Sequence, residues 1–363
     1  MSIPTTQKSL LLLQESTPYV VGERPVPRPG SKEVLVKIMA CALNPADYFI
    51  PDPPYSKWLI KSWPFVPGED AAGIVVQVGA EVASLKEGDR VLFEANVDTP
   101  DGAAFQQYAT VDADLVAIIP DNISFESAAS IPLAITTDAM LLYNQSPAPE
   151  NLGLRLTPLW EPEGKTAYAG TPAFIIAGSA SLGQYAIQLA KLAGHNPIIT
   201  TASLHNASLL TSLGATHVLD RMRSNDSILN ELPSLTGGKP IEYAFVGAPF
   251  DPEACRLGRD ALAPGGALGI LVPTPAAVPE DVANAGGGKR VGYASGSVWL
   301  PHGRDCGLVL FKHLTQWLQK GMLKPNPVEV LPNGLAGIPE GLARMKANKV
   351  SGKKLVAKPQ ETA

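Results

Sequence analysis

Cysteine, charge and long apolar runs are all scarce in this 363-residue chain. Three cysteines, an odd number, stand far apart at Cys41, Cys255 and Cys306. This spacing argues against a disulfide framework and favours a reducing compartment, so we expect a cytoplasmic protein. No apolar run approaches the ~18 residues of a membrane span. A formal net charge of −5, with no run of Lys and Arg longer than a pair, argues against nucleic acid and membrane as partners.

Histidine and cysteine, the usual zinc ligands, are almost absent from the first half of the chain. No histidine precedes His195, and Cys41 is the only cysteine before Cys255. Catalytic zinc needs three protein ligands drawn from Cys, His and carboxylates. We therefore predict no metal site. The adjacent acids Glu69 and Asp70 could form a hard-metal pair or a general acid/base dyad, but such acids after Pro-Gly more often shape and solvate a turn.

The first ~120 residues contain short β-rich runs with little helical periodicity. Examples are Val34–Ile38, Ala72–Val78 and Arg90–Phe93, and Gly and Pro separate such runs. This pattern predicts a mostly antiparallel or barrel-like domain.

From Ser124 onward the pattern changes. Ser124 is a plausible helix N-cap, Ser127–Tyr143 has the length of a helix, and the Pro- and Gly-rich stretch Ser146–Gly170 is expected to form a surface connection. Short apolar runs then alternate with helix-sized stretches, which predicts a parallel, doubly wound sheet. The predicted strands are Ala173–Ile176, Pro197–Thr200, His217–Leu219, Tyr243–Val246, Ala267–Val272 and Val291–Tyr293, and the predicted helices are Tyr185–Ala193, Ala207–Leu213 and Ser227–Leu232. An amphipathic helix over Leu308–Lys320 and a strand over Lys354–Ala357 follow, and we expect this strand to return to the first domain.

The turn Gly178–Gly183 joins the first of these strands to a helix. Its small residues Ser179, Ala180 and Ser181 would let backbone N–H groups and a helix N-terminus approach a pyrophosphate, while Leu182 and Gly183 would pack the helix start on the sheet. The middle glycine of the dinucleotide fingerprint is absent. The same residues differ from the hydrolase motif G-x-S-x-G only in the first position. By itself the turn leaves open a phosphate cradle, a nucleophile elbow with Ser181, and a plain connection.

A stretch without carboxylates follows this turn. NAD-binding folds usually place an acid about 20 residues after the glycine motif, where it binds the ribose hydroxyl. Here no Asp or Glu occurs from Gln184 to Leu219. A 2′-phosphate could instead be bound jointly by Ser203, His205, Asn206 and Arg221. This possibility favours NADPH over NAD. A simpler interpretation is that Ser203 caps the following helix, and the two roles can coexist.

Several ordered motifs together resemble the medium-chain dehydrogenase/reductases. The resemblance is greatest to the zinc-free quinone oxidoreductase-like branch and to the fungal trans-acting enoyl reductases that serve polyketide synthases. The motifs are Asn44-Pro45-Ala46-Asp47, Pro67–Gly73, Gly88–Val91, Ile131-Pro132 with Thr136-Thr137, Gly178–Gly183 with Tyr185–Lys191, and Lys349–Lys353. In zinc-bearing relatives a Cys stands where Asn44 is and a His where Glu69 is.

The resemblance implies an α/β protein with two domains and a substrate site in the cleft between them. A GroES-like, β-rich catalytic domain would comprise residues 1–124 and 299–363, and a Rossmann domain would comprise residues 125–298. By position, Asp47 and Thr137 would lie near the nicotinamide, Ser179 to Leu182 at the pyrophosphate, Ser203 to Asn206 at the 2′-phosphate, and Leu271, Val350 and Ser351 along the cofactor. The loop Ser295 to Trp299, with Gly296, Ser297 and Trp299, would meet the substrate.

One position departs from the fungal enoyl reductases, which often carry a Lys where this chain has Phe49. An apolar lining is therefore expected there. Tyr48, Phe49 and the aromatic-rich segment Pro51–Trp63 either shape the pocket mouth or belong to the domain core. Tyr48 is the nearby candidate for a general acid, and Thr137 is expected to orient the reactants.

These observations together favour an NADPH-dependent oxidoreductase. It would reduce, without zinc, the C=C bond of an enoyl thioester, enone or quinone that is a small molecule or carrier-bound, and a polyketide synthase is a possible partner. The oligomeric state is left open. The alternatives are a serine hydrolase that uses Ser181 and a catalytically idle NADPH-binding protein.

Overall fold

The computed structural model describes residues 3–248, 251–272, 277–294 and 296–363. Internal contacts divide the chain into two compact units. The first unit comprises Met1–Leu133, Leu314–Gly321 and Pro325–Ala363, and the second comprises Ala134–His313 and Met322–Lys324. The predicted domain boundaries at 124/125 and 298/299 stay a prediction.

The first unit is built on a seven-stranded sheet in the order β14-β15-β3-β4-β5-β7, with β6 also paired to β3. Its strands are β3 (Glu33–Ala42), β4 (Asp70–Val78), β5 (Arg90–Glu94), β6 (Tyr108–Asp112), β7 (Ala117–Ile118), β14 (Val328–Val330) and β15 (Lys354–Ala357). All pairs are antiparallel except β14 with β15. The prediction of a mostly antiparallel first domain is therefore confirmed.

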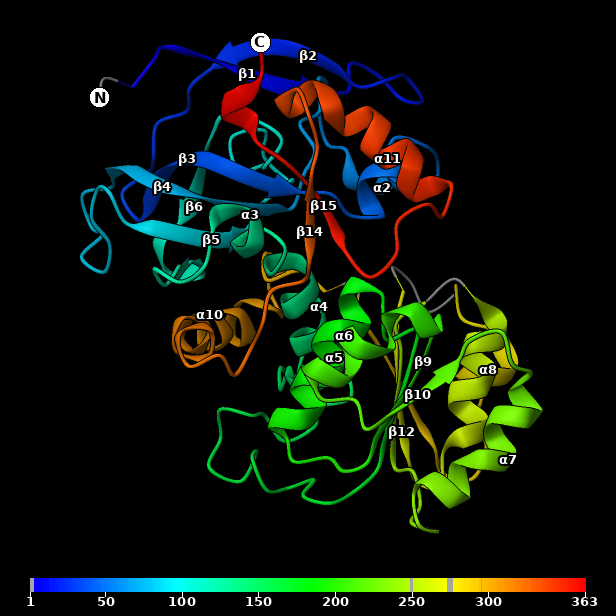
Figure 1. Cartoon of the computed structure of the whole chain (residues 1–363). Coiled ribbons are helices and arrows are strands. Elements are labelled where there is room, and N and C mark those ends of the chain that lie inside the picture. Colours follow the sequence, from blue (N-terminus) through cyan, green and yellow to red (C-terminus); the bar gives the residue numbers. More distant parts are fainter. Residues whose placement is uncertain (1–2, 249–250, 273–276, 295) are drawn as a thin grey trace. The chain divides into compact units, whose positions relative to one another are not determined.

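Strand β3 occupies the middle of this sheet. Val34, Leu35 and Val36 are consecutive and buried, so both faces of the strand are covered. β15 pairs with β3 through Val356 and Ala42, which confirms that the last strand returns to the first unit. Figure 1 shows this late segment, in red, beside the blue strand.

A two-stranded antiparallel sheet and several short helices complete the first unit. The strands are β1 (Thr6–Leu11) and β2 (Val20–Pro25), which the apolar pattern did not predict. The helices are α1 (Ala46–Phe49), α2 (Tyr55–Leu59), α3 (Phe125–Ala128) and α11 (Ile338–Lys346), with 3-10 turns η1 (Ala113–Leu115), η4 (Gly334–Gly337) and η5 (Pro359–Glu361).

The predicted helix Ser127–Tyr143 is wrong as a single element. The chain forms α3 and then α4 (Pro132–Tyr143), with a break over residues 129–131. Pro132 has no N–H to continue the first helix, but proline is well suited to open the second. The capping prediction is confirmed, because the Ser124 hydroxyl accepts a hydrogen bond from the N–H of Ser127 at 3.2 Å.

The second unit contains a six-stranded, wholly parallel sheet in the order β10-β9-β8-β11-β12-β13. Its strands are β8 (Ala173–Ile176), β9 (Ile198–Ala202), β10 (His217–Asp220), β11 (Tyr243–Val246), β12 (Ala267–Leu271) and β13 (Arg290–Ala294). The prediction of a parallel, doubly wound sheet is confirmed. Because β9 and β10 lie on one side of β8 and β11 lies on the other, the topological switch point falls between β8 and β11.

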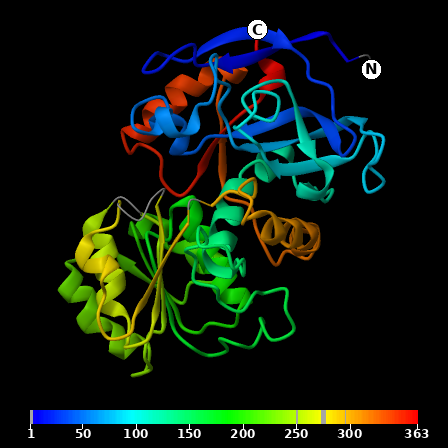
Figure 2. The same cartoon turned by 180° about the vertical axis from the view of Figure 1, so that it is seen from behind.

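Helices cover both faces of this sheet, as Figures 1 and 2 show, with α5 and α6 on one face and α7 and α8 on the other. The helices of these two layers are α5 (Ser181–Leu192), α6 (Ala207–Leu213), α7 (Asn225–Leu235) and α8 (Pro252–Ala261). The short helix α9 (Glu280–Ala283) and the 3-10 turn η2 (Leu204–Asn206) also belong to this unit, and α10 (Arg304–Gln319) is divided between the two units. Apolar residues of the strands, such as Phe174, Val246 and Ile270, belong to one buried cluster with residues of α7 and α8.

The connection Ser146–Gly170 is not simply a surface loop as predicted. Leu154 and Leu159 are each 2% exposed. The N–H of Leu154 donates to the carbonyl of Leu141 at 2.7 Å, which ties the segment to α4. Its apolar side chains therefore pack into the second unit.

The described helices include none with the length and apolar character needed to cross a membrane. Cys41, Cys255 and Cys306 are all buried, free thiols.

Candidate active site

The turn after β8 brings Ser179 to Gly183 to the switch point of the parallel sheet. Helix α5 begins at Ser181, and the N–H of Gln184 donates to the carbonyl of Ala180 at 2.9 Å. The first N–H groups of a helix have no acceptor within it, and they carry the positive end of the helix dipole. The start of α5 therefore suits an anion such as a pyrophosphate.

Gly183 has the small size that this turn requires. A Cβ atom at Gly183 would lie 2.4 Å from the carbonyl oxygen of Ala177 and 2.6 Å from the Cα of Gly178. Any side chain would therefore push α5 away from the end of β8. The close approach of helix and strand keeps the N–H groups of the first helical turn near the sheet edge.

The same turn lacks the form of a nucleophile elbow. The elbow presents its serine on a strained strand-to-helix turn. Here the residue with a left-handed backbone is Ala177, with φ of 60°, while Ser181 already belongs to α5. The geometry gives no support to a hydrolase.

Ser203 and Arg221 meet at the ends of two neighbouring parallel strands. Ala202 of β9 pairs with Asp220 of β10, so the next residues lie side by side. The Nε of Arg221 donates to the Ser203 hydroxyl at 2.8 Å. Ser203 precedes η2 but makes no side-chain capping bond, so the capping interpretation is wrong.

Arg221 differs from its neighbour Arg223 in the partners it has. Arg223 forms an ion pair with Glu231 and hydrogen bonds with Ser227. Arg221 is exposed and forms no ion pair with any residue that the structure describes. Its guanidinium is therefore available to an external anion. The other two predicted residues of this loop are His205, which is exposed, and Asn206, which is buried.

Thr137 and Gly296, predicted separately, are in contact within the second unit. The Thr137 hydroxyl donates to the carbonyl of Gly296 at 3.2 Å. A Cβ atom at Gly296 would lie 2.5 Å from the Cα of Thr137. Ser297 and Trp299 follow and are half-buried, and Leu271 is half-buried at the end of β12. Ser295 lies outside the described residues.

In the first unit, Asp47 and Asp70 are both fully buried. The backbone N–H of Asn44 donates to Asp47 at 2.8 Å, and its side-chain amide donates to Asp70 at 2.8 Å. Asp70 also accepts from the N–H of Leu133 at 2.6 Å and pairs with the ammonium of Lys354. Burial raises the pKa of Asp47 well above its ordinary value, and the nearby charge of Glu69 adds to the effect.

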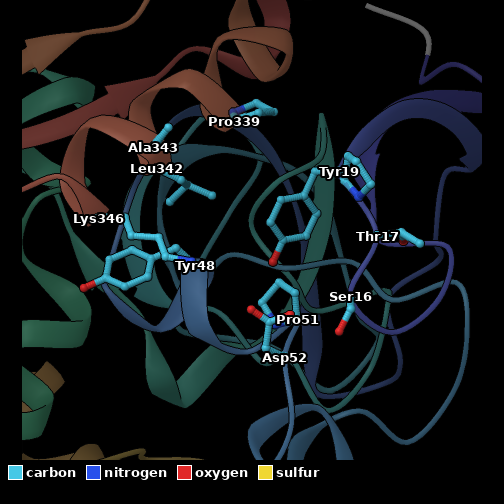
Figure 3. A pocket seen from close by; sticks show the side chains of 11 residues that line it. Ser16, Thr17, Tyr19, Tyr48, Pro51, Asp52, Pro339, Leu342, Ala343 and Lys346 are labelled. Carbon is cyan, nitrogen blue, oxygen red and sulfur yellow. The ribbon is translucent and has the colours of Figure 1, made fainter.

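Tyr48 lines a pocket of about 330 Å³ within the first unit. Figure 3 shows Tyr19 and Tyr48 beside Leu342 and Lys346 of α11. Burial raises the pKa of Tyr48, which makes its hydroxyl a weaker acid. Tyr48 thus lies at a cavity, and its role in a substrate site stays a prediction.

The aromatic residues after Tyr48 form a partly exposed cluster. The rings of Phe49 and Tyr55 lie 4.7 Å apart, and Tyr55 also contacts Trp58. Trp58 is 56% exposed, and Trp63 is 42% exposed. The interpretation of these two tryptophans as domain core is wrong. Two further predicted cofactor residues, Val350 and Ser351, lie in the segment between α11 and β15, half-buried and exposed respectively.

Within the described ranges, no group of three or more His, Cys, Asp or Glu side chains is arranged to hold a metal ion. The carboxyls of Asp47, Glu69 and Asp70 influence one another electrostatically, and the ammonium of Lys354 counteracts the rise in the pKa of Asp47 and of Glu69.

Comparison with known proteins identifies both parts of the chain. Residues 30–121 match the alcohol dehydrogenase GroES-like domain, and residues 181–282 match the family described as zinc-binding dehydrogenase. A trans-enoyl reductase of Gibberella fujikuroi is 32% identical over 355 residues, which cover 92% of this chain and 93% of that protein. The chain belongs to the medium-chain dehydrogenase/reductase superfamily. It is therefore an oxidoreductase of the class that uses a nicotinamide cofactor.

Further proteins and solved structures are similar to most of this chain. A dehydrogenase of Monascus ruber is 37% identical over 260 residues, which cover 70% of this chain and 67% of that protein. Among solved structures, the quinone oxidoreductase of Coxiella burnetii superposes with a TM-score of 0.73 at 23% identity, covering 97% of this chain and 99% of that one. An alcohol dehydrogenase superfamily protein from Novosphingobium aromaticivorans gives a TM-score of 0.77 at 21% identity, covering 96% and 98%. The predicted GroES-like and Rossmann fold is confirmed.

Sequence reasoning did not single out Lys354 and did not separate Glu69 from Asp70. Lys354 and Asp70 are 284 residues apart in the sequence, so no local pattern predicts that they form a pair. The only local sign of this cluster was the pair of acids after Pro67-Gly68, and such a pair is equally typical of a solvent-exposed turn.

Proposed function

We propose that this protein is an NADPH-dependent reductase that transfers a hydride to the C=C bond of an α,β-unsaturated carbonyl compound without zinc. The acceptor would be an enoyl thioester, an enone or a quinone. The observation that carries the cofactor choice is the Ser203–Arg221 pair, which follows a chain stretch without a carboxylate. A carboxylate there would bind the ribose hydroxyl of NAD and repel the 2′-phosphate of NADPH.

The residues present fit this cofactor both at its pyrophosphate and at its 2′-phosphate. The start of α5 offers backbone N–H groups and a positive dipole end to the pyrophosphate, and Gly183 permits the close approach. Arg221 offers guanidinium donors to the 2′-phosphate. By resemblance, Asp47 and Thr137 would lie near the nicotinamide, with Leu271, Val350 and Ser351 along the cofactor. When bound, NADPH would supply the hydride.

Reduction of a conjugated C=C bond suits a site without a metal ligand set. The negative charge that develops on the carbonyl oxygen can be stabilised by backbone N–H or hydroxyl donors. Asn44 and Glu69 stand where zinc-bearing relatives carry Cys and His, and the described residues offer no other metal-holding group. By resemblance, Thr137 would orient the reactants, and Phe49, Gly296, Ser297 and Trp299 would contact the substrate. Tyr48 stays the candidate general acid expected from the sequence.

The relatives named trans-enoyl reductases support an enoyl thioester as the acceptor. The substrate would then arrive on a carrier, and the partner would be a polyketide synthase. Rates with the same enoyl group on a small thiol and on an acyl carrier protein measure this dependence. A higher kcat/KM for the carrier-bound form supports a synthase partner, and equal values argue for a small-molecule substrate.

The decisive experiment is titration of the metal-free protein with NADPH and NADH, followed by turnover. Binding is measured by cofactor fluorescence, and turnover by loss of cofactor absorbance with a panel of enoyl thioesters, enones and quinones. We expect tighter binding of NADPH and turnover that a chelator leaves unchanged. Failure to bind NADPH would overturn the proposal. Binding without any turnover supports the idle NADPH-binding protein, and fluorophosphonate labelling lost in Ser181→Ala supports the hydrolase.

A further inference from the structure

The pocket of about 330 Å³ in the first unit is lined by three parts of the chain. They are the loop between β1 and β2, helix α1 with the turn after it, and helix α11. All three belong to the first unit, so the pocket is a property of that unit alone. Cavities that bind small molecules begin at about 300 Å³. The pocket is therefore large enough for a small ligand.

Two tyrosine rings and a leucine give the pocket its apolar walls. The hydroxyl of Tyr19 donates to the carbonyl of Asp47 at 2.8 Å, which fixes this ring against α1. The ring of Tyr48 lies edge-on to that of Phe49, with their centroids 5.8 Å apart. Leu342 of α11 is 4% exposed. Contacts within the protein therefore hold these walls in place.

The loop between β1 and β2 closes another side of the pocket. Ser16 has a left-handed backbone with φ of 54°, which is uncommon for a residue with a side chain. Its N–H donates to the carbonyl of Pro51 at 3.0 Å, and the hydroxyl of Thr17 donates to the carbonyl of Gln14 at 2.7 Å. These bonds tie the loop to the turn after α1. The pocket is preformed, which lowers the free-energy cost of binding a ligand.

Lys346 supplies the positive charge of the pocket. Arg344, two residues earlier on α11, pairs with Glu329 at 2.7 Å. Lys346, by contrast, forms no ion pair and no side-chain hydrogen bond with any residue that the structure describes. The hydroxyl of Tyr48, beside Lys346 in Figure 3, also forms no hydrogen bond with a described residue. An ammonium beside this hydroxyl offers two donors to a carboxylate.

Asp52 supplies the negative charge of the pocket. Burial raises the pKa of Tyr19, and the charges of Asp47 and Asp52 add to the rise, so the Asp52 carboxylate acts on the Tyr19 hydroxyl. Asp52 is exposed and has no ion pair among the described residues. In Figure 3 it lies below the ring of Tyr19, whereas Lys346 lies beside Tyr48. A carboxylate near an aromatic ring suits an ammonium group.

We propose that this pocket is a second ligand site, which binds a small zwitterion with an apolar body, such as an α-amino acid or a dipeptide. The carboxylate of the ligand lies at Lys346 and the Tyr48 hydroxyl, and its ammonium lies at Asp52 and the Tyr19 ring. The apolar body packs on Leu342. A simple anion would be repelled by Asp52 and a simple cation by Lys346, whereas a zwitterion satisfies both. This ligand differs from an enone or enoyl acceptor, so the site goes beyond the proposed reductase function.

Calorimetric titration of the whole ligand-free chain tests the need for both charges. The zwitterionic probes are L-phenylalanine and glycyl-L-phenylalanine, in which the ammonium and carboxylate groups have different separations. Phenylpropionate keeps the ring and the carboxylate, and phenylethylamine keeps the ring and the ammonium. We expect at least one zwitterion to bind saturably at one site per chain. Both single-charge analogues should bind at least about 10-fold more weakly.

The variants Lys346→Met and Asp52→Asn assign the two ends of the ligand. Each should raise the Kd for the zwitterion about 10- to 100-fold. Lys346→Met should not weaken the binding of phenylethylamine, and Asp52→Asn should not weaken that of phenylpropionate. The matched controls are Lys86→Met and Asp114→Asn, at exposed positions of the same unit, and both should bind like the wild type. Thermal unfolding establishes that all four variants are folded.

Three outcomes overturn the proposal and leave the reductase standing. The first is a wild type that binds neither zwitterion saturably. The second is equal affinity for a zwitterion and its single-charge analogues, or an unchanged Kd in both pocket variants, because the ring alone would then be recognised. The third is displacement of the zwitterion by an uncharged enone of similar affinity, which would assign the pocket to the acceptor instead.

Discussion

The hydroxyl of Thr137 on α4 donates a hydrogen bond to the carbonyl of Gly296, which lies 159 residues later in the chain. This bond joins a residue expected at the nicotinamide to the loop expected at the substrate. Both belong to the second unit, so their contact is a property of that unit alone. A shift of either residue is therefore passed to the other.

Thr137→Val tests the hydroxyl itself. Valine keeps the shape of the side chain but leaves the Gly296 carbonyl without this donor, at a cost of about 1 kcal/mol in unfolding free energy. We expect kcat to fall about 10-fold with NADPH binding nearly unchanged, because orientation rather than affinity is lost. Thr137→Ser should restore most of kcat. Steady-state kinetics and urea unfolding measure the two effects, and an unchanged kcat in Thr137→Val would count against the orienting role.

Arg221→Ala tests the choice of cofactor. Loss of the guanidinium removes charge-assisted hydrogen bonds to the 2′-phosphate, so we expect the Kd for NADPH to rise about 10- to 100-fold and that for NADH to change little. Arg223→Ala is the matched control, since its guanidinium is already engaged by Glu231 and Ser227. That control should lower thermal stability without altering the NADPH-to-NADH ratio. Equal weakening of both cofactors in Arg221→Ala would contradict the assignment.

Lys354→Met tests the buried ion pair with Asp70. Removing the ammonium leaves a fully buried carboxylate without its cation, which should lower the unfolding free energy by about 3–5 kcal/mol. The double variant Lys354→Met with Asp70→Asn should regain much of this loss, because no unpaired charge remains. Denaturant unfolding of the three variants forms a double-mutant cycle. Additive losses in the double variant would show that the pair is not coupled.

Asp138 gives a prediction about pH. Both of its carboxyl oxygens are buried without a hydrogen-bond partner, and burial raises its pKa well above the ordinary value of 3.8. Between these two pKa values the unfolded chain binds fewer protons than the folded one, so stability falls as pH rises, by at most about 1.4 kcal/mol per pH unit. Asp138→Asn cannot ionise and should flatten this decline.

Thermal unfolding between pH 5 and pH 8 checks the effect of Asp138→Asn. The variant should gain most over the wild type at pH 8 and least at pH 5. Asp305→Asn, at an exposed position of α10, serves as the control and should keep the wild-type slope. Parallel pH profiles for wild type and Asp138→Asn would mean that Asp138 is ionised in the folded protein.

Sequence patterns predicted the second unit better than the first. Ala173–Ile176 and Tyr243–Val246 are short, wholly apolar runs between turn residues, and both are strands with those bounds. β2 was not predicted because Val20–Pro25 has no buried residue and therefore no regular apolar pattern. It is a strand through its pairing with β1. The helix break before Pro132 was missed because proline is compatible with the first turn of a helix.

The candidate site also contains one feature that the sequence predicted and one that it did not. The turn at Gly178–Gly183 was recognisable because its small residues are consecutive and follow a strand. Glu69 and Asp70 stand side by side in the same motif, and only the fold gives Asp70 three partners while it leaves an oxygen of Glu69 without one. Such differences depend on residues far away in the chain, which local patterns do not reveal.

The pairing of β15 with β3 has a consequence for biosynthesis. The first unit receives this strand, and with it Lys354, only after the whole second unit has been translated. During synthesis the second unit can fold once residue 324 has been made, because nearly all of it is the continuous stretch Ala134–His313. Strand β3 and the carboxylate of Asp70 lack their partners in β15 until residues 354–357 have been made. Ribosome-bound chains that end before residue 354 should therefore contain a protease-resistant second unit and a protease-sensitive first unit.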